Sequence, residues 1–472
     1  MLSATKQTQI VAYETQTRYR LAVQCGAYGS DMEREATSMT HIHLAYGTAG
    51  LNVDFPPCDL TVVAPQAAPA LPDADAAITT ALRAPIAHAS LADTVRGAKR
   101  VVVVHSDLTR PTPNQVILPP ILRELERAGI PDDAITMLNG TGMHRPNTPV
   151  ELTQMLGAAV TARYRCLNHD AFNPADLTDC GETHEGNRVL VNTLFREADA
   201  VIVTGFIEPH FFAGFSGGPK GVVPGIAGEA TVLHNHGARH IRDAGSTWGV
   251  TDGNPLWEEI AEAATLAIGG RPCFLVNVTL NNDKAVTGVY AGDLFAAHRA
   301  GIAAVRTAAM QPVSAPFDIV ITTNSGYPLD LNLYQTIKGV SAANRVLKDG
   351  GTIIAVAECR EGLPEHGNYK RILQMARTPD ELVALIESPG FRMFDQWEAH
   401  IQGLIQRRAR LLLYSTIPDE DVRAAHIEPI HDIPVALSQL LNHYGPTARV
   451  CVLPEGPQTI PYLPVEALQA AD

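Results

Sequence analysis

The sequence lacks the marks of a secreted, disulfide-stabilised or membrane-spanning protein. Its seven cysteines are scattered among 472 residues and form no CxxC pair, which indicates reduced thiols rather than a disulfide framework. No run of about 18 consecutive apolar residues occurs, so no membrane span is expected. The N-terminal residues MLSATKQTQIVAYETQTRYR contain no continuous apolar segment, and a secretory signal is not expected either. The expected location is the cytoplasm.

Positive charge is also scarce. The 36 Lys and Arg residues are outnumbered by 50 Asp and Glu residues, which gives a formal net charge of −14. Nucleic-acid binding needs a basic surface, so we expect no nucleic-acid partner, although a local basic pocket for a small anion is compatible with this balance. Apolar residues make up 46% of the chain and charged residues 18%, as in an ordinary globular protein. The length of 472 residues predicts two domains rather than one.

Two common nucleotide-binding motifs are missing as well. No GxGxxG opens a helix after the first strand, and no GxxxxGK[ST] occurs. A conventional NAD-dependent dehydrogenase and a P-loop enzyme are therefore disfavoured.

What the sequence does contain is a regular alternation of short apolar runs with helix-like segments. The runs are rich in β-branched residues and each is followed by turn residues. Continuous apolar runs suit parallel strands that are buried on both faces. The predicted fold class is α/β: two α/β domains with mainly parallel sheets and the active site in the cleft between them. The predicted strands cover residues 101–105, 200–204, 274–278, 318–322, 352–356, 410–414 and 450–453.

One domain boundary is visible in the sequence. A helical segment over residues 294–310 leads into QPVSAP at 311–316, a proline-punctuated linker. We therefore expect an N-terminal extension over 1–40, an N-terminal domain with the cofactor-binding and catalytic groups over 41–310, a C-terminal α/β domain over 315–455 and a tail over 456–472 that returns to the first domain.

The segment VVVVHSDLTRPTP at residues 101–113 places polar groups at the end of a predicted strand. In open α/β folds this is where ligands bind. Thr112 and Pro113 fit the N-cap and first position of a following helix, whose N-terminus beside Arg110 would attract an anion. The alternative is that Asp107 and Arg110 pair with each other and cap the turn.

Two further segments place histidine and lysine beside glycine-rich turns. NGTGMHRP at 139–146 carries His144 in a loop after a predicted strand at 135–138. GFIEPHFFAGFSGGPKGVVPG begins at residue 205 and carries His210, predicted at the end of a buried strand, and Lys220. Lys220 lies in an almost uncharged neighbourhood, where desolvation would lower its pKa and make its amine usable as a nucleophile or attachment point.

The pair His234 and His236 follows as H-N-H. Neutral imidazole is a common ligand of late first-row metals, but no third donor at a familiar zinc spacing is apparent. Downstream, DIVITTNSGYPLDLNLYQTIKG at 318–339 places Gln335 and Lys338 on one helix face at i and i+3. Such a pair suits a hydroxy-carboxylate, but is also common on solvated helices.

Taken in order, these segments resemble the lactate racemase family, whose members carry a nickel-pincer nucleotide. The resemblance runs from about residue 43 to the C-terminus and rests on DLTRP, GMHRP, PHFFAGFSGGPKGVVPG with HNH, and NSGYPLDLNLYQTIKG. It implies that Lys220 is joined to the cofactor, a Ni(II)-pyridinium-3,5-bisthiocarboxylic acid mononucleotide, and that His236 rather than His234 is the nickel ligand. It implies catalytic acid/base roles for His144 and His210. The other implied roles are cofactor binding by Asp107, Leu108, Thr109 and Arg110, and substrate binding by Arg110, Gln335, Lys338 and Trp397.

This resemblance implies a racemase or epimerase of a 2-hydroxy acid that acts by proton-coupled hydride transfer, because the Cα–H of such an acid is too weakly acidic for simple deprotonation. Leu108 stands where lactate-specific members often have histidine, which leaves the substrate open among lactate and related hydroxy acids. The implied partners are a small-molecule substrate and cofactor-maturation enzymes, and a homo-oligomer is allowed. Two alternatives are a non-catalytic homologue that binds a nucleotide or anion, and a zinc-dependent hydrolase that uses His234 and His236.

Overall fold

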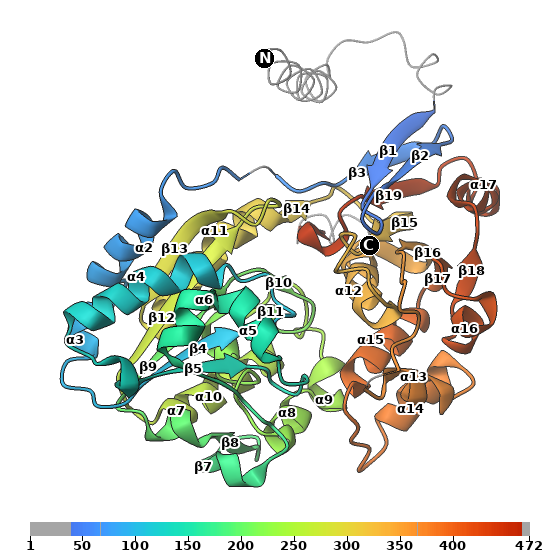
Figure 1. The fold of residues 1–472 in the computed structure, drawn as a ribbon. Helices are drawn as coiled ribbons and strands as arrows, with labels where there is room; N and C mark the ends of the chain where they lie inside the picture. The colour runs from blue at the N-terminus through green and yellow to red at the C-terminus, as the bar shows by residue number, and fades with distance from the viewer. Residues whose placement is uncertain (1–38, 67, 366, 465–472) are drawn as a thin grey trace, which may run out of the picture.

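The chain folds into two α/β halves that lie side by side (Figure 1). This computed structural model describes residues 39–66, 68–365 and 367–464. Nearly all of the predicted N-terminal extension therefore lies outside the described residues, as does the end of the predicted tail. Within the described ranges, no helix is long and apolar enough to cross a membrane.

The first half is built on a six-stranded sheet with the order β13-β12-β9-β4-β5-β6. All neighbours are parallel except β13, which runs antiparallel to β12. Every residue of the central strand β9 is buried, which explains its mainly apolar sequence AVIVTGF. The strands are β4 (Val101–Ser106), β5 (Ile135–Gly140), β6 (Arg165–Asn168), β9 (Ala200–Phe206), β12 (Cys273–Leu280) and β13 (Val286–Gly292).

Helices cover both faces of this sheet (Figure 1). The longer ones have one apolar side, which packs on the strands and closes the core. They are α2 (Ala74–Arg83), α4 (Asn114–Arg127), α10 (Pro255–Ile268) and α11 (Leu294–Ala309). Shorter helices are α3 (Leu91–Thr94), α5 (Pro149–Leu156), α6 (Ala158–Arg163), α7 (Thr193–Glu197), α8 (Glu229–Asn235) and α9 (Ala238–Ile241).

The second half has its own six-stranded sheet, in which all neighbours are parallel, with the order β18-β17-β16-β15-β19-β3. Its strands are β3 (Asp59–Val62), β15 (Phe317–Thr323), β16 (Leu347–Val356), β17 (Arg410–Tyr414), β18 (Glu428–Ile430) and β19 (Arg449–Leu453). Its helices are α12 (Leu333–Asn344), α13 (Tyr369–Gln374), α14 (Pro379–Ile386), α15 (Gln396–Gln406), α16 (Asp419–Ala424) and α17 (Ile433–Tyr444). The predicted fold class, with mainly parallel sheets, is confirmed.

The edge strand β3 comes from the start of the chain, before the first half begins. The hairpin β1 (Thr40–Leu44) and β2 (Leu51–Phe55) also packs in the apolar cluster of the second half, through Ile42 and Phe55. These residues were expected in the first domain, and the difference arises because β3 completes the second sheet by pairing with β19. The predicted boundary at residues 311–316 falls at β14 (Met310–Pro312), which pairs with β20 (Ile460–Tyr462) of the predicted tail. The domain limits themselves stay a prediction.

Two local predictions need correction. Helix α4 begins at Asn114, with Pro113 at its N-cap and no side-chain cap. The Thr112 hydroxyl bonds instead to the Ser106 hydroxyl at 2.7 Å, which ties the loop back to the end of β4. His210 does not end the buried strand β9; it lies in the short β10 (Pro209–His210), which pairs with β11 (Gly214–Phe215).

Candidate active site

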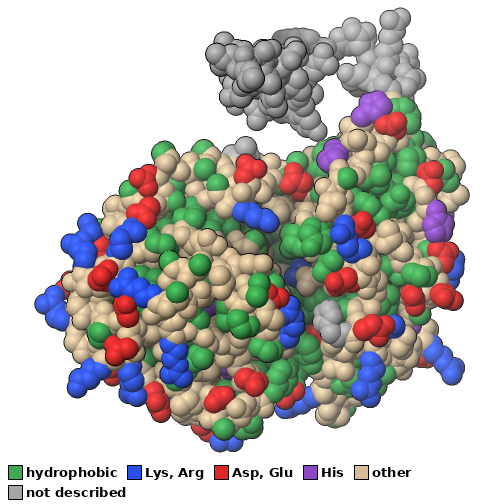
Figure 2. Space-filling model, in the orientation of Figure 1, with side chains coloured by type: hydrophobic (Ala, Val, Ile, Leu, Met, Phe, Trp, Pro, Cys, Tyr) green, Lys and Arg blue, Asp and Glu red, His purple; other side chains and the backbone are tan. Residues whose placement is uncertain are grey.

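A pocket lies where the two halves meet, and the surface is hollowed along this line (Figure 2). Its wall in the first half is formed by the residues that follow β4, β5 and β9, and its wall in the second half by α12 and α15. The carboxyl ends of parallel strands meet at one edge of a sheet, which is why segments distant in sequence converge here. Of the residues predicted for the site, the pocket is lined by Asp107, Thr109, Arg110, His144, His210, Lys220, His236, Gln335, Lys338 and Trp397.

Leu108 and His234 are not among the lining residues. The Leu108 side chain is exposed, and its backbone N–H donates to the Asn147 amide oxygen at 3.2 Å. His234 lies in α8, with its ring beside that of His240. Of the two histidines in the H-N-H pair, it is therefore His236 that faces the pocket.

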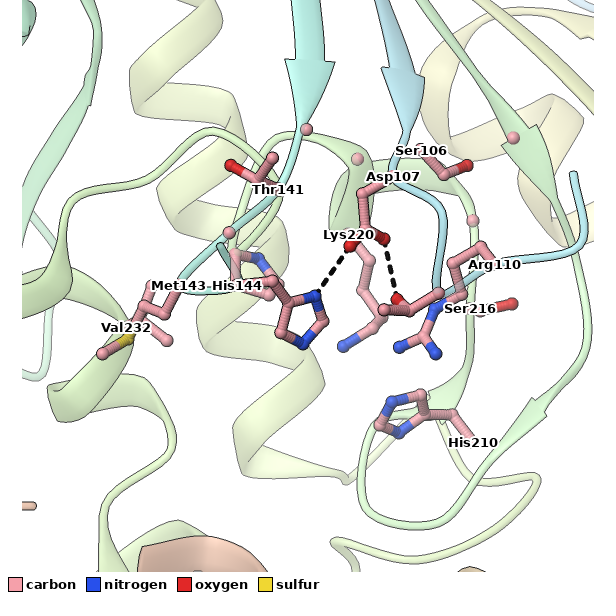
Figure 3. A pocket seen from close by; sticks show the side chains of 18 of the residues that line it. Ser106, Asp107, Arg110, Thr141, Met143, His144, His210, Ser216, Lys220 and Val232 are labelled. Atoms are coloured by element: carbon pink, nitrogen blue, oxygen red, sulfur yellow. Dashed lines mark hydrogen bonds and ion pairs between the residues drawn. The ribbon is translucent and has the colours of Figure 1, made fainter. Parts of the chain in front are cut away.

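Asp107 holds His144 at the mouth of the pocket (Figure 3). Its carboxylate lies 2.9 Å from His144 Nδ1 and accepts a hydrogen bond from the Thr109 hydroxyl at 2.7 Å. Burial raises the pKa of Asp107, but the hydrogen bond and charge of His144, with Arg110 and Thr109, more than offset this, so the net pKa is lowered. An ionised Asp107 fixes the proton of neutral His144 on Nδ1, which leaves Nε2 free to accept a proton.

The alternative pairing of Asp107 with Arg110 is not observed. The ion pair that Asp107 forms within the described part of the chain is with His144. The backbone N–H of Arg110 donates to the Asp107 carbonyl at 3.1 Å, and its guanidinium has no carboxylate partner among the described residues. Arg110 is therefore available to an anionic ligand.

His210 lies deeper, between aromatic rings. Its ring stacks on Phe211 with centroids 5.0 Å apart and meets Phe212 edge-on at 4.5 Å. The Ala213 N–H donates to Nδ1 at 3.3 Å. Burial first, and then the positive charges of Lys220 and its neighbours, hold the pKa of His210 well below its usual value. His210 is neutral near pH 7.

The Lys220 amine stands beside His210 without an acidic partner (Figure 3). No hydrogen bond or ion pair reaches its Nζ from the described residues, and its one aromatic contact is with Phe212, 5.6 Å from the ring centre. Burial, followed by the charge of Arg110, lowers the pKa of Lys220 from 10.5 to about 7. A large fraction of this amine is therefore neutral and nucleophilic near neutral pH.

Glycines position Lys220 by allowing the loop to approach the core closely. Gly217 and Gly218 have φ values of 78° and 53°, a region that other residues rarely adopt. A Cβ atom on Gly217 would lie 2.5 Å from the Asn277 amide oxygen, and one on Gly218 would lie 2.5 Å from the His298 ring. The Gly218 N–H also donates to Asn277 at 2.8 Å. The loop is thus fixed against β12 and α11, and Lys220 follows in the short helix η4 (Gly218–Gly221).

His236 caps the C-terminal end of α8 and is buried. Its Nδ1 has no hydrogen-bond partner among the described residues. Its ring meets Phe212 and Trp397 edge-on, with centroids 5.1 and 5.2 Å away. Burial, and next the charge of Lys220, keep the pKa of His236 well below its usual value, so the ring is in the neutral form that binds metals.

The second half contributes a hydrogen-bonded pair and an aromatic wall. The Lys338 ammonium donates to the Gln335 side-chain oxygen at 2.7 Å, so the predicted shared face of α12 is confirmed and points into the pocket. Burial first, then Arg110, lowers the pKa of Lys338 to about 8. The Trp397 indole N–H donates to the Tyr334 hydroxyl at 3.1 Å.

Sequence reasoning missed Tyr334 and Glu398, which also line the pocket. Glu398 is fully buried on α15, and neither of its carboxylate oxygens has a hydrogen-bond partner within the described residues. The one available signal was its position next to Trp397, since a charge beside a site residue on an otherwise buried helix is unusual.

The residues fit the nickel-pincer nucleotide. An unpaired amine of low pKa offers an attachment point, an unpaired neutral imidazole offers one metal ligand, and Arg110 offers an anion contact. The described residues contain no group of three or more His, Cys, Asp or Glu side chains that could hold a metal ion. A metal at His236 would thus take its other ligands from a bound molecule.

Two family models match the chain. The lactate racemase N-terminal domain matches residues 46–249 and the lactate racemase C-terminal domain matches residues 313–460. The chain is 36% identical to a lactate racemase of Lactiplantibacillus plantarum, over 79% of this chain and 87% of that protein. It is 32% identical to a lactate racemase of Thermoanaerobacterium thermosaccharolyticum, over 89% of this chain and 99% of that protein.

Solved structures agree with this. The lactate racemase apoprotein from Thermoanaerobacterium thermosaccharolyticum superposes with a TM-score of 0.83 at 31% identity, covering 89% of this chain and all of that one. A protein from Thermotoga maritima shares the fold, with a TM-score of 0.64 at 21% identity, over 83% of this chain and 98% of that one. Fold, pocket and relatives together define an isomerase of the racemase class. The chain belongs to the lactate racemase family.

Proposed function

We propose that this enzyme racemises or epimerises a 2-hydroxy acid, lactate or a related acid, by proton-coupled hydride transfer to a nickel-pincer nucleotide attached to Lys220. The observation that carries the proposal is the Lys220 amine, which has a pKa of about 7 and no acidic partner in the described chain. It shares a pocket with two histidines, His144 and His210, and with a neutral imidazole, His236. When bound, the nickel-pincer nucleotide supplies an acceptor for the hydride that leaves C2 of the substrate.

His144 serves as base for one enantiomer. Its Nε2 carries the free lone pair because Asp107 holds the proton on Nδ1. As Nε2 takes the proton of the substrate hydroxyl, the ring becomes positively charged, and the adjacent Asp107 carboxylate stabilises that charge. The arrangement matches the base–carboxylate pairing of hydrolase triads.

His210 serves the other enantiomer from a different environment. With Ala213 donating to Nδ1, the neutral ring carries its proton on Nε2, and this N–H donates a hydrogen bond to a substrate oxygen. A carboxylate bound nearby offsets the positive charges that hold the pKa of His210 down, so substrate binding itself makes His210 more basic. Acting as base then requires the ring to change tautomer.

Arg110 and Lys338 hold the substrate carboxylate, and Gln335 fixes the direction of the Lys338 ammonium through its 2.7 Å hydrogen bond. The two cations come from opposite halves, so a bound carboxylate bridges the pocket. Trp397, Phe394 and Phe212 line the same pocket and exclude water around the reacting carbon.

Production of the chain together with the cofactor pathway tests the proposal. The peptide that contains Lys220 should gain the mass of the cofactor, and chiral chromatography should show interconversion of the enantiomers of a 2-hydroxy acid. An unmodified Lys220 would contradict the cofactor assignment. A loaded protein without turnover of any hydroxy acid would favour the non-catalytic binding protein. The zinc hydrolase would need stoichiometric zinc, and no cluster of ligands in the described residues favours it. The maturation partners and the cytoplasmic location stay predictions.

A further inference from the structure

Glu398 has a buried carboxyl group for which the described residues supply no hydrogen-bond partner. Its side chain lines the pocket and its residue has an exposed fraction of 0%. Both carboxylate oxygens lack a hydrogen bond to any described residue. A polar group taken out of water without compensation is costly, and proteins keep one in a ligand pocket where the ligand compensates it.

Lys338 is the cation that affects the pKa of Glu398, but the two side chains form no ion pair. The Lys338 ammonium instead donates to Gln335 at 2.7 Å. The two groups still interact electrostatically. Burial raises the pKa of Glu398 to about 8, and the charge of Lys338 partly opposes this rise. An acceptor and a donor that face one pocket without touching leave room for a group able both to accept and to donate. A hydroxyl is such a group.

The substrate contacts proposed above leave one substituent of C2 unassigned. The carboxylate belongs to Arg110 and Lys338, and the 2-hydroxyl to the two histidines. The remaining substituent is left with Trp397 and Glu398. A methyl group there would leave the Glu398 oxygens unpaired, whereas a hydroxyl group would pair with them.

We propose that Glu398 is a specificity-determining residue that accepts a hydrogen bond from a hydroxyl on C3 of the substrate. The substrate class that it selects is the 2,3-dihydroxy acids, with glycerate as the simplest member. This inference rests on the proposed function, since it concerns the same pocket and the same reaction.

Binding to the full-length protein without cofactor tests the inference independently of turnover. Calorimetry with the D- and L-forms of glycerate and lactate should rank glycerate first, about 10- to 100-fold above lactate. Glu398→Met keeps an unbranched side chain but removes the acceptor. It should bring the affinity for glycerate to within about twofold of that for lactate. In the loaded enzyme, kcat/KM should show the same ranking and the same loss.

Glu124→Gln is the matched control, because Glu124 is a buried glutamate on α4 that pairs with Arg83 outside the pocket. It should leave the ranking of the acids unchanged. The melting temperature of Glu398→Met supplies a second measurement: removal of a buried polar group without a hydrogen-bond partner should not lower it. A lower melting temperature with an unchanged ranking would show that Glu398 is structural and would overturn the inference.

The two proposals fail in different ways. If a loaded protein turns over lactate, and lactate binds as tightly as glycerate in both the wild type and Glu398→Met, the role of Glu398 is wrong while the proposed function stands. If no hydroxy acid binds or reacts although Lys220 carries the cofactor, the proposed function is wrong as well.

Discussion

The two pocket histidines, His144 and His210, have surroundings of opposite charge. His144 is half-exposed and has a carboxylate, Asp107, on its Nδ1. His210 is buried between phenylalanine rings, and the charged groups that chiefly affect it, Lys220, Arg110 and Lys338, are cations. The Asp107 carboxylate stabilises the protonated form of His144. The cations around His210 disfavour its protonated form until an anion binds. Under the proposed mechanism, this difference implies that His144 can accept a proton in the empty pocket, whereas His210 becomes an effective base only after an anionic substrate binds.

The largest effect is expected from substituting Lys220, one of the cations beside His210. Lys220→Met should abolish covalent cofactor loading and all racemisation, because no other amine occupies this position in the loop. Intact mass and a chiral product assay on protein produced with the cofactor pathway measure both. Lys99→Met is the control, since Lys99 is an exposed lysine outside the pocket. Retained loading in Lys220→Met would refute the attachment site.

Substituting Asp107, the carboxylate beside His144, should cause a smaller but still large loss of activity. Asp107→Asn removes the charge that stabilises protonated His144 and permits the wrong tautomer, so kcat should fall by on the order of 10²- to 10⁴-fold. For a racemase the equilibrium constant between enantiomers is one, so kcat/KM must fall equally for both. Steady-state kinetics from each enantiomer measure this. Asp133→Asn, at an exposed carboxylate, is the control; a similar loss there would point to a general effect of charge.

The low pKa of Lys220 raises the fraction of its amine that is neutral at pH 7 by about three orders of magnitude over that of an ordinary lysine. An ordinary lysine has a pKa near 10.4 and is almost wholly protonated at pH 7, whereas Lys220, with a pKa of about 7, is about half neutral. Acylation of cofactor-free protein, followed by peptide mass spectrometry, should give a midpoint near pH 7 for Lys220.

The lowered pKa of Lys220 also makes the stability of the fold depend on pH. Between pH 7 and 10.5 the unfolded chain keeps the Lys220 proton that the folded chain has lost, so this group makes the cofactor-free fold more stable as the pH rises. Lys220→Met should flatten that rise in urea unfolding measurements. A labelling midpoint near 10 together with an unaltered slope would contradict the buried, uncompensated amine.

The smallest effect is expected at Leu108, which follows Asp107 in the chain but does not line the pocket. Leu108→His at this exposed position should change the free energy of unfolding by no more than about 0.5 kcal/mol. Its influence should be confined to a few-fold change in KM among hydroxy acids. Chemical denaturation and kinetics on a panel of acids measure the two quantities. A large loss of kcat would show that Leu108 contacts the reacting groups.

Much of the fold was predictable because buried parallel strands leave a strong sequence pattern. The run 200–204 became β9, and 410–414 became β17, since both are surrounded by helices and neighbouring strands. β3 was not predictable in its sheet. Its sequence Asp59–Val62 is short and only partly buried, and its partner β19 lies almost four hundred residues later, so no local signal tells which sheet it joins.

The site was partly predictable for a similar reason. His144, Lys220 and Gln335 lie in loops and helix starts that follow buried strands, where ligands bind in this fold class. Asp107 as the partner of His144 was not predictable, because a contact 37 residues apart depends on how β4 and β5 pair. Glu398 escaped because a charged residue on a helix is normally solvated, and its burial depends on how α12, α13 and α15 pack together.

Strand β3 makes the first half an insertion within the second. The chain leaves the second sheet after β3, builds the first half and returns through β14 into β15. Two covalent crossings, rather than one, thus join the halves, and the β14–β20 pairing adds hydrogen bonds beside the second crossing. The two crossings lie side by side, because the Gln66 side chain donates to the Gln311 side-chain oxygen at 3.1 Å and residues of both crossings line one small cavity, so they form a single paired connection between the halves. In the proposed function, a substrate carboxylate held by Arg110 and Lys338, which come from opposite halves, would join the halves a second time at the pocket.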